Sequence, residues 1–112
     1  YGSIVEWMYR NLAGLRPCEG APGFRRARIQ PDLPRSFDWV KMRFDSPVGE
    51  YRVAWRRTAK TVSFAISVPF GAEAEIVLPN APGKVKMNGN LVAAKGIVLR
   101  AGAAAFSYAP VA

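Results

Sequence analysis

The stretch Thr61-Val-Ser-Phe-Ala-Ile-Ser-Val68 decides the fold, because its most apolar residues stand at every second position. Polar Thr61, Ser63 and Ser67 stand between them, so one face of the segment is apolar and the other meets water. A period of two over this length is typical of a β-strand with one buried face. The stretch therefore predicts a sheet whose inner face carries the core.

The same alternation recurs in short segments on both sides of this stretch. Turn residues separate them, among them Asp45-Ser-Pro-Val-Gly49 and the tight-hairpin pair Asn88-Gly89. About eight short strands at intervals of about ten residues are typical of an antiparallel sandwich. We therefore expect a mainly β protein, an antiparallel β-sandwich preceded by one N-terminal α-helix. The apolar positions of the flanking segments are Ala27, Ile29, Val40, Met42, Phe44, Tyr51, Val53, Trp55, Ala74, Ile76, Leu78, Val85, Met87, Leu91, Ala93, Ile97, Leu99, Phe106 and Tyr108.

The N-terminal segment, Tyr1–Leu15, has the period of a helix instead. Ser3 and Glu6 form the S-x-x-E capping pattern, and Gly14 is placed to end the helix in a left-handed conformation. Its apolar face is too large for a helix alone in water, which predicts docking onto a large partner. That face consists of Ile4, Met8 and Leu12.

Composition narrows the classes of function. The 112 residues carry sixteen basic and eight acidic side chains, a net charge of +8, so an acidic partner has to be considered. With Cys18 as the single cysteine and no histidine, we expect no disulfide framework, no metal and no cofactor. No apolar run is long enough to cross a bilayer, so no membrane partner is expected.

Five segments carry motifs of one enzyme family. They are GSIVEWMYRNLAGL at 2–15, APGF at 21–24, FDSPVG at 44–49 with Trp55 after it, VPFG at 68–71 and IVLP at 76–79. Together they resemble the C-terminal region of bacterial α-L-rhamnosidases, glycoside hydrolase family 78. The resemblance covers nearly the whole chain, and the helical motif combined with the D-S-P-x-G turn is its most specific part.

The resemblance implies a division of the chain into three parts. In that family the catalytic module is an (α/α)6 barrel, and the C-terminal module is a β-sandwich. Residues 1–16 would be the last barrel helix, residues 17–25 a linker, and residues 26–112 the C-terminal sandwich. The partner of the helix would then be the catalytic barrel of the same parent chain.

The resemblance also implies the chemistry of the parent enzyme. A glycoside hydrolase of this family would release terminal α-L-rhamnose with inversion from rhamnose-containing glycosides, using one carboxylic acid and one carboxylate. In the family these carboxylates lie in the barrel, and no catalytic residue of the family maps onto this sequence. We therefore expect the fragment to be a structural, non-catalytic accessory domain. A free-standing carbohydrate-binding module is the alternative.

Three aromatic residues are candidates for stacking on a sugar ring. Tyr51 and Trp55 share the parity of Val53 on their predicted strand, so we expect both in the core. Trp39 has the opposite parity to the apolar residues of its own strand and is expected to face outward. It is the one weak candidate for substrate binding, and contact with the barrel would explain its exposure equally well.

Charged residues raise three further interpretations. Glu73 and Glu75 would share a strand face at about 7 Å, which overlaps the spacing of an inverting pair, yet such glutamates are usually the solvated side of a sheet. Glu6 most simply completes the capping pattern, although its helix start would lie near the sugar pocket of an intact barrel. Four basic residues share a predicted solvent face, but nucleic acid is not an expected partner because no binding signature accompanies them. They are Lys41, Arg43, Arg52 and Arg56.

Overall fold

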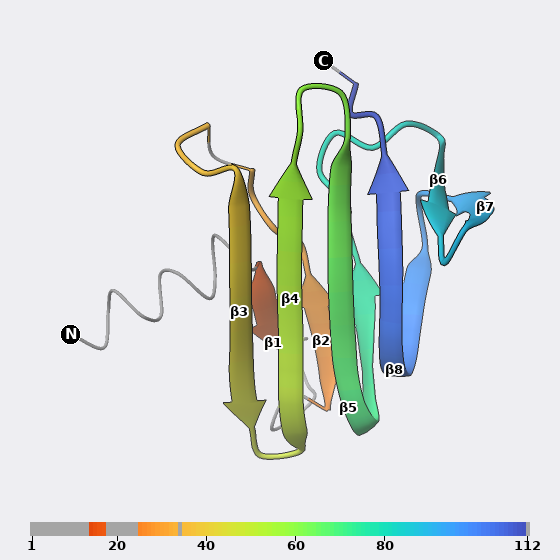
Figure 1. The fold of residues 1–112 in the computed structure, drawn as a ribbon. Helices are drawn as coiled ribbons and strands as arrows, with labels where there is room; N and C mark the ends of the chain where they lie inside the picture. The colour runs from red at the N-terminus through yellow and green to blue at the C-terminus, as the bar shows by residue number, and fades with distance from the viewer. Residues whose placement is uncertain (1–13, 18–24, 34, 112) are drawn as a thin grey trace.

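The computed structural model describes residues 14–17, 25–33 and 35–111, and the regular structure in these ranges is all β (Figure 1). Most of the predicted N-terminal helix lies outside the described residues. In these same ranges no helix has the length and apolar character needed to cross a bilayer. The strands are β1 (Leu15–Pro17), β2 (Arg26–Ile29), β3 (Trp39–Ser46), β4 (Gly49–Arg57), β5 (Val62–Ile76), β6 (Lys84–Met87), β7 (Asn90–Ala93) and β8 (Ile97–Tyr108).

Two long strands, β5 and β8, run through both layers of the sandwich. Residues 62–67 of β5 pair with β4, and residues 62–68 pair with residues 102–108 of β8. Residues 73–76 of β5 pair instead with β2 and with residues 97–100 of β8. The register shifts between Val68 and Glu73, where the pair passes from one layer to the other. Figure 1 shows β3 and β4 in the layer nearest the viewer and β1 and β2 behind it. The predicted sandwich is confirmed, and it is built from one hydrogen-bonded sheet folded over on itself.

The predicted strand list differs from the structure in two respects. Two pairs of segments that were expected as separate short strands are continuous: residues 62–68 and 74–76 both lie in β5, fifteen residues long, and residues 97–99 and 106–108 both lie in β8, twelve residues long. The pairing of β2 with β5 is parallel, although the rest of the sheet is antiparallel. Both differences arise from long-range pairing, which the local alternation of a segment does not encode.

The described chain begins in a strand where we expected the end of a helix. Leu15–Pro17 pairs antiparallel with β2, and the backbone N–H of Gln30 donates to the Gly14 carbonyl at 2.9 Å. Assigning residues 15 and 16 to the helix and Pro17 to the linker was therefore wrong, and the sheet starts at Leu15. Leu15 is only 4% exposed, so the edge of β2 offers it both hydrogen bonds and apolar contact. Gly14 does adopt the predicted left-handed conformation, with φ +67°.

The core lies between the two layers and consists mostly of the positions predicted from the alternation. The prediction was wrong for β7, where Leu91 and Ala93 are exposed and Val92 packs against the core instead. Every second residue of β4 and of the first half of β5 is buried. Phe64 stacks on Tyr108 across the pair of strands β5 and β8, with ring centroids 6.1 Å apart. The largest side chains that are almost fully enclosed are Tyr51, Phe64, Phe106, Ile29, Ile66 and Ile76.

Two tight hairpins form where the sequence predicted turns. Asn88 and Gly89 have φ values of +51° and +86°, the positive pair that a two-residue type I′ hairpin requires, and they join β6 to β7. The D-S-P-V-G turn joins β3 to β4, where the Ser46 hydroxyl donates to the Gly49 carbonyl at 2.7 Å. Both turns set the registers that place the outward side chains described below.

Tyr108 links the stability of this core to alkaline pH. Its hydroxyl donates to the Pro79 carbonyl at 2.7 Å, and burial raises the pKa of Tyr108 because the phenolate would lose its hydration. Since the folded-state pKa lies above the unfolded value of about 10, the unfolded chain ionises first. The contribution of Tyr108 to stability is therefore complete below about pH 10 and declines above it.

We expect Tyr108→Phe to lose about 1 kcal/mol of unfolding free energy at neutral pH, together with the hydrogen bond. Between about pH 7 and pH 11 the variant should lose less stability than the parent chain, because it has no hydroxyl to ionise. Urea denaturation at both pH values measures the two differences. Parallel alkaline losses in the two proteins would show that Tyr108 is not the titrating group.

Candidate functional site

The outer side of one layer presents a broad face, here called the front face. It is formed by β3, β4, residues 62–68 of β5, residues 102–108 of β8, and β6 with the turn that follows it. Strand pairing aligns its outward side chains in three rows. The rows are Trp39, Arg56, Ser63, Ser107 and Lys86; then Lys41, Ala54, Ala65, Ala105 and Asn88; and then Arg43, Arg52, Ser67 and Ala103.

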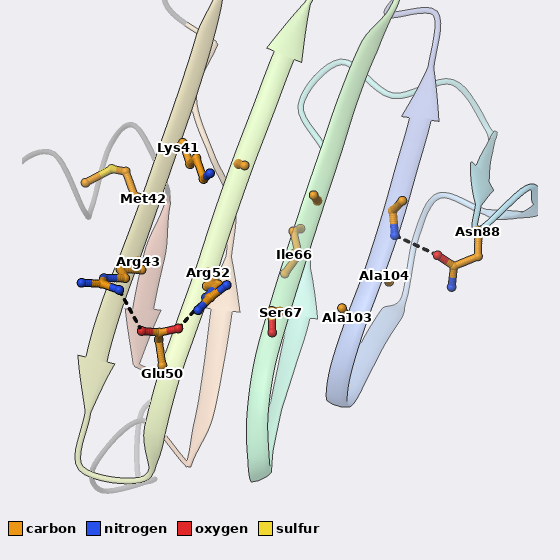
Figure 2. A pocket seen from close by; sticks show the side chains of 13 residues that line it. Lys41, Met42, Arg43, Glu50, Arg52, Ile66, Ser67, Asn88, Ala103 and Ala104 are labelled. Carbon is orange, nitrogen blue, oxygen red and sulfur yellow. Dashed lines mark hydrogen bonds and ion pairs between the residues drawn. The ribbon is translucent and has the colours of Figure 1, made fainter.

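The middle of the front face is a groove, because the central strands carry small side chains there. Ala54, Ala65 and Ala105 lie side by side on β4, β5 and β8 and form its floor. The groove has a volume of about 1040 Å³, and an adjoining hollow of about 430 Å³ extends it towards Trp39. Figure 2 shows long basic side chains of β3 and β4 along one side of the groove and Asn88 at the other.

One wall of the groove is cationic. At one end Glu50 lies between two guanidinium groups, with a carboxylate oxygen 3.8 Å from Arg43 Nη1 and the other oxygen 2.5 Å from Arg52 Nε (Figure 2). Towards the other end, Lys41 and Arg56 form no ion pair with any carboxylate in the described ranges. The two cations of this wall that form no ion pair with a described carboxylate therefore lie beside Trp39.

The opposite wall is held in place by hydrogen bonds. The backbone N–H of Asn88 donates to the Ala105 carbonyl at 2.8 Å, and the Ala105 N–H donates to Asn88 Oδ1 at 2.9 Å. These bonds fix the Asn88 side chain against β8. Its amide nitrogen is then available as a donor at the edge of the groove.

The aromatic candidates divide as the parity predicted. Trp39 is 62% exposed on the front face, whereas Tyr51 and Trp55 are 0% and 2% exposed in the core. The expected burial of Tyr51 and Trp55 is thus confirmed, and so is the outward position of Trp39. A role for Trp39 in binding a substrate stays a prediction.

Glu73 and Glu75 lie on the outer side of the other layer, where arginines bind them. Arg26 Nε is 3.1 Å and Arg100 Nε 3.6 Å from the Glu73 carboxylate, and Arg28 Nη2 is 3.6 Å from that of Glu75. The interpretation as the solvated side of a sheet is confirmed. Glu6 lies outside the described residues. In the described part of the chain no three Asp, Glu or Cys side chains gather as metal ligands do.

The sequence predicted that the basic residues of the groove share one face, but it did not identify the other residues that line the groove. The β3–β4 register brings Arg43 opposite Arg52, as their shared face predicted. Glu50 and Asn88 were not identified as parts of a site, and neither was the alanine floor. A signal for the floor does exist, because alanines occupy outward positions on three strands, but they come together only once the register is known.

Comparisons with known proteins place this fold in a family. The family model for the bacterial alpha-L-rhamnosidase C-terminal domain matches residues 14–92. The chain is 33% identical over 79 residues to an alpha-L-rhamnosidase of Alteromonas sp. (strain LOR). The matching stretch covers 70% of this chain and 8% of that protein. An alpha-L-rhamnosidase of Streptomyces avermitilis is also 33% identical over 79 residues, again 70% of this chain and 8% of that protein.

Two solved structures share the fold along almost the whole chain. The alpha-L-rhamnosidase from Dictyoglumus thermophilum superposes with a TM-score of 0.82 at 28% identity, over 95% of this chain and 13% of its own. The Streptomyces avermitilis alpha-L-rhamnosidase complexed with L-rhamnose gives 0.80 at 28% identity, over 96% of this chain and 11% of its own. The chain thus spans only a small part of the enzymes that it matches. It belongs to the family of bacterial α-L-rhamnosidase C-terminal domains.

Proposed function

We propose that this chain is an accessory domain that supports the catalytic domain of a larger α-L-rhamnosidase and cleaves no glycoside itself. One observation carries the proposal: nearly the whole chain corresponds to about a tenth of much longer enzymes. The parent enzyme would release terminal α-L-rhamnose from rhamnose-containing glycosides with inversion. Its acid and base would then lie outside this segment.

The described carboxylates support a non-catalytic role. An inverting glycosidase needs one carboxyl group facing the glycosidic oxygen and another facing a water molecule, roughly 6.5–9.5 Å apart. Glu73 and Glu75, the pair with a suitable position on one strand, are both bound by arginines. Glu50 lies between Arg43 and Arg52. Guanidinium groups therefore hold the carboxylate oxygens of these three glutamates.

The connection to the catalytic domain is the second part of the proposal. Residues 1–13 would belong to the last helix of an (α/α)6 barrel, and the domain with the sandwich fold would begin with β1. Leu15 and Gln30 support this boundary, because β1 is hydrogen-bonded to the sheet immediately after Gly14. Because Gly14 and Leu15 are adjacent in the chain, no linker would separate the barrel helix from the first strand of the sandwich. The sandwich would therefore lie next to the barrel.

The experiment compares the chain alone with the full protein encoded by its gene. We expect the full protein to hydrolyse an aryl α-L-rhamnoside and the 112-residue chain to give no rate above background. Removal of residues 15–112 from the full protein should shorten its half-life on heating several-fold, because a large apolar contact would become exposed. Hydrolysis by the chain alone, or full heat resistance after the deletion, would contradict the proposal.

A further inference from the structure

We propose that the front-face groove binds a carboxylated polysaccharide, with sugar carboxylates at Lys41 and Arg56 and one sugar ring against Trp39. This inference goes beyond support of a catalytic domain, since it assigns a ligand to a surface of the sandwich itself. It rests on the distribution of charge, on the shape of the groove and on the exposed ring of Trp39 beside it.

Charge distinguishes the front face from the outer face of the other layer. On that other face Arg26, Arg28 and Arg100 are all engaged by Glu73 or Glu75. On the front face five cationic side chains project beside two carboxylates, Glu50 and Asp45, which both lie at the end away from Trp39. The cations are Lys41, Arg43, Arg52, Arg56 and Lys86. An anionic ligand would therefore be drawn to the Trp39 end of the groove.

The shape of the groove favours a thin, extended ligand. Its floor is made of alanine side chains, and the basic side chains of β3 and β4 stand above it. The rows of Trp39 and Arg43 are four residues apart on β3, which corresponds to roughly 13 Å. A chain of sugar rings can lie along such a floor while its carboxylates reach the cations at the side. Asn88 can donate to a sugar hydroxyl from the opposite wall.

The exposed aromatic ring favours a sugar over a nucleic acid. Proteins that hold single-stranded nucleic acid usually stack successive bases on several aromatic side chains. The described rows of the front face contain only Trp39 as an exposed ring. One ring next to Lys41 and Arg56 matches one sugar ring that carries a carboxylate. Arg56 is the register partner of Trp39 on β4, so both can contact the same unit.

Binding to polygalacturonate, measured by calorimetry at moderate salt, tests the proposal. Fully methyl-esterified polygalacturonate is the matched ligand, because it keeps the sugar chain and removes the charge. We expect the chain to bind the acid form at least tenfold more tightly than the ester. Equal binding of the two polymers, or no binding of either, would overturn the inference.

Two pairs of substitutions distinguish binding in the groove from attraction by the net charge of the chain. Lys41→Ala combined with Arg56→Ala should weaken binding at least tenfold. Arg16→Ala combined with Lys95→Ala removes the same charges from β1 and from the β7–β8 turn, outside the groove, and should change affinity less than twofold. Thermal unfolding confirms that all variants are folded. Equal weakening by both pairs would show general charge attraction and overturn the assignment.

A third set of measurements distinguishes the class of ligand. Trp39→Ala should weaken polygalacturonate binding several-fold and leave binding of polyglutamate unchanged. Tighter binding of polyglutamate than of polygalacturonate would assign the groove to an acidic protein, and tighter binding of single-stranded DNA would assign it to a nucleic acid. Either result would overturn the proposal. Neither result would bear on the proposed accessory role, because that role is tested by the hydrolysis and heat resistance of the full protein.

Discussion

Replacement of Phe64 by alanine is expected to destabilise the chain by about 3–5 kcal/mol. Phe64 is 2% exposed, stacks on Tyr108, and stands in register between Trp55 on β4 and Phe106 on β8. Truncation would leave a cavity in the core between the layers, where the neighbouring rings are held by their own strands and can close it only in part. Equilibrium urea denaturation measures the loss directly.

Phe70→Ala is the matched control for Phe64→Ala. Phe70 lies on the same strand and undergoes the same chemical change, but it is 93% exposed. Its truncation should alter the unfolding free energy by less than about 0.5 kcal/mol. Similar losses for the two variants would mean that burial does not follow the alternation along β5.

A second large loss is expected for Gly14→Ala. Gly14 has φ +67°, and a Cβ atom there would lie 2.1 Å from both the carbonyl carbon and the carbonyl oxygen of Gln30. The left-handed conformation costs an alanine about 1–2 kcal/mol, and the clash adds about 1–3 kcal/mol because the backbone atoms of Gln30, immediately after β2, cannot rotate away. We expect a total of about 2–5 kcal/mol, with faster amide exchange in β1.

Gly71→Ala distinguishes the cost of the left-handed backbone conformation from the cost of the steric clash. Gly71 has φ +85°, yet no atom lies within 4 Å of a Cβ built at that position. This variant should show only the conformational cost of about 1–2 kcal/mol. If urea denaturation gives Gly14→Ala no greater loss than Gly71→Ala, the close approach of Gly14 to β2 does not contribute to stability.

Local alternation was sufficient to predict which side chains of the long central strands β4 and β5 face the core. A strand with one buried face repeats every two residues, so Trp39 could be placed outside and Tyr51 and Trp55 inside without any knowledge of the partner strands. The Asn88-Gly89 turn was predictable for the same reason, since its positive φ values are a property of two adjacent residues.

Pairing between distant segments could not be predicted in this way. Leu15–Pro17 is too short to show a period, and its strand conformation comes from the free edge of β2. The groove is a property of register as well: Ala54, Ala65 and Ala105 are far apart in the sequence and become neighbours only through β4, β5 and β8. The basic residues of the site were visible in the sequence, but the floor between them was not.

The passage of β5 and β8 through both layers has a mechanical consequence. In a sandwich of two separate sheets, the layers can slide or part by breaking only the contacts between them. Here each layer contains half of the same two strands, so covalent backbone crosses the corner at residues 69–72 and 101. A force applied to one layer is therefore transmitted to the other through the backbone of β5 and β8. Under such a force the domain should unfold in a single step, without a prior separation of the two layers.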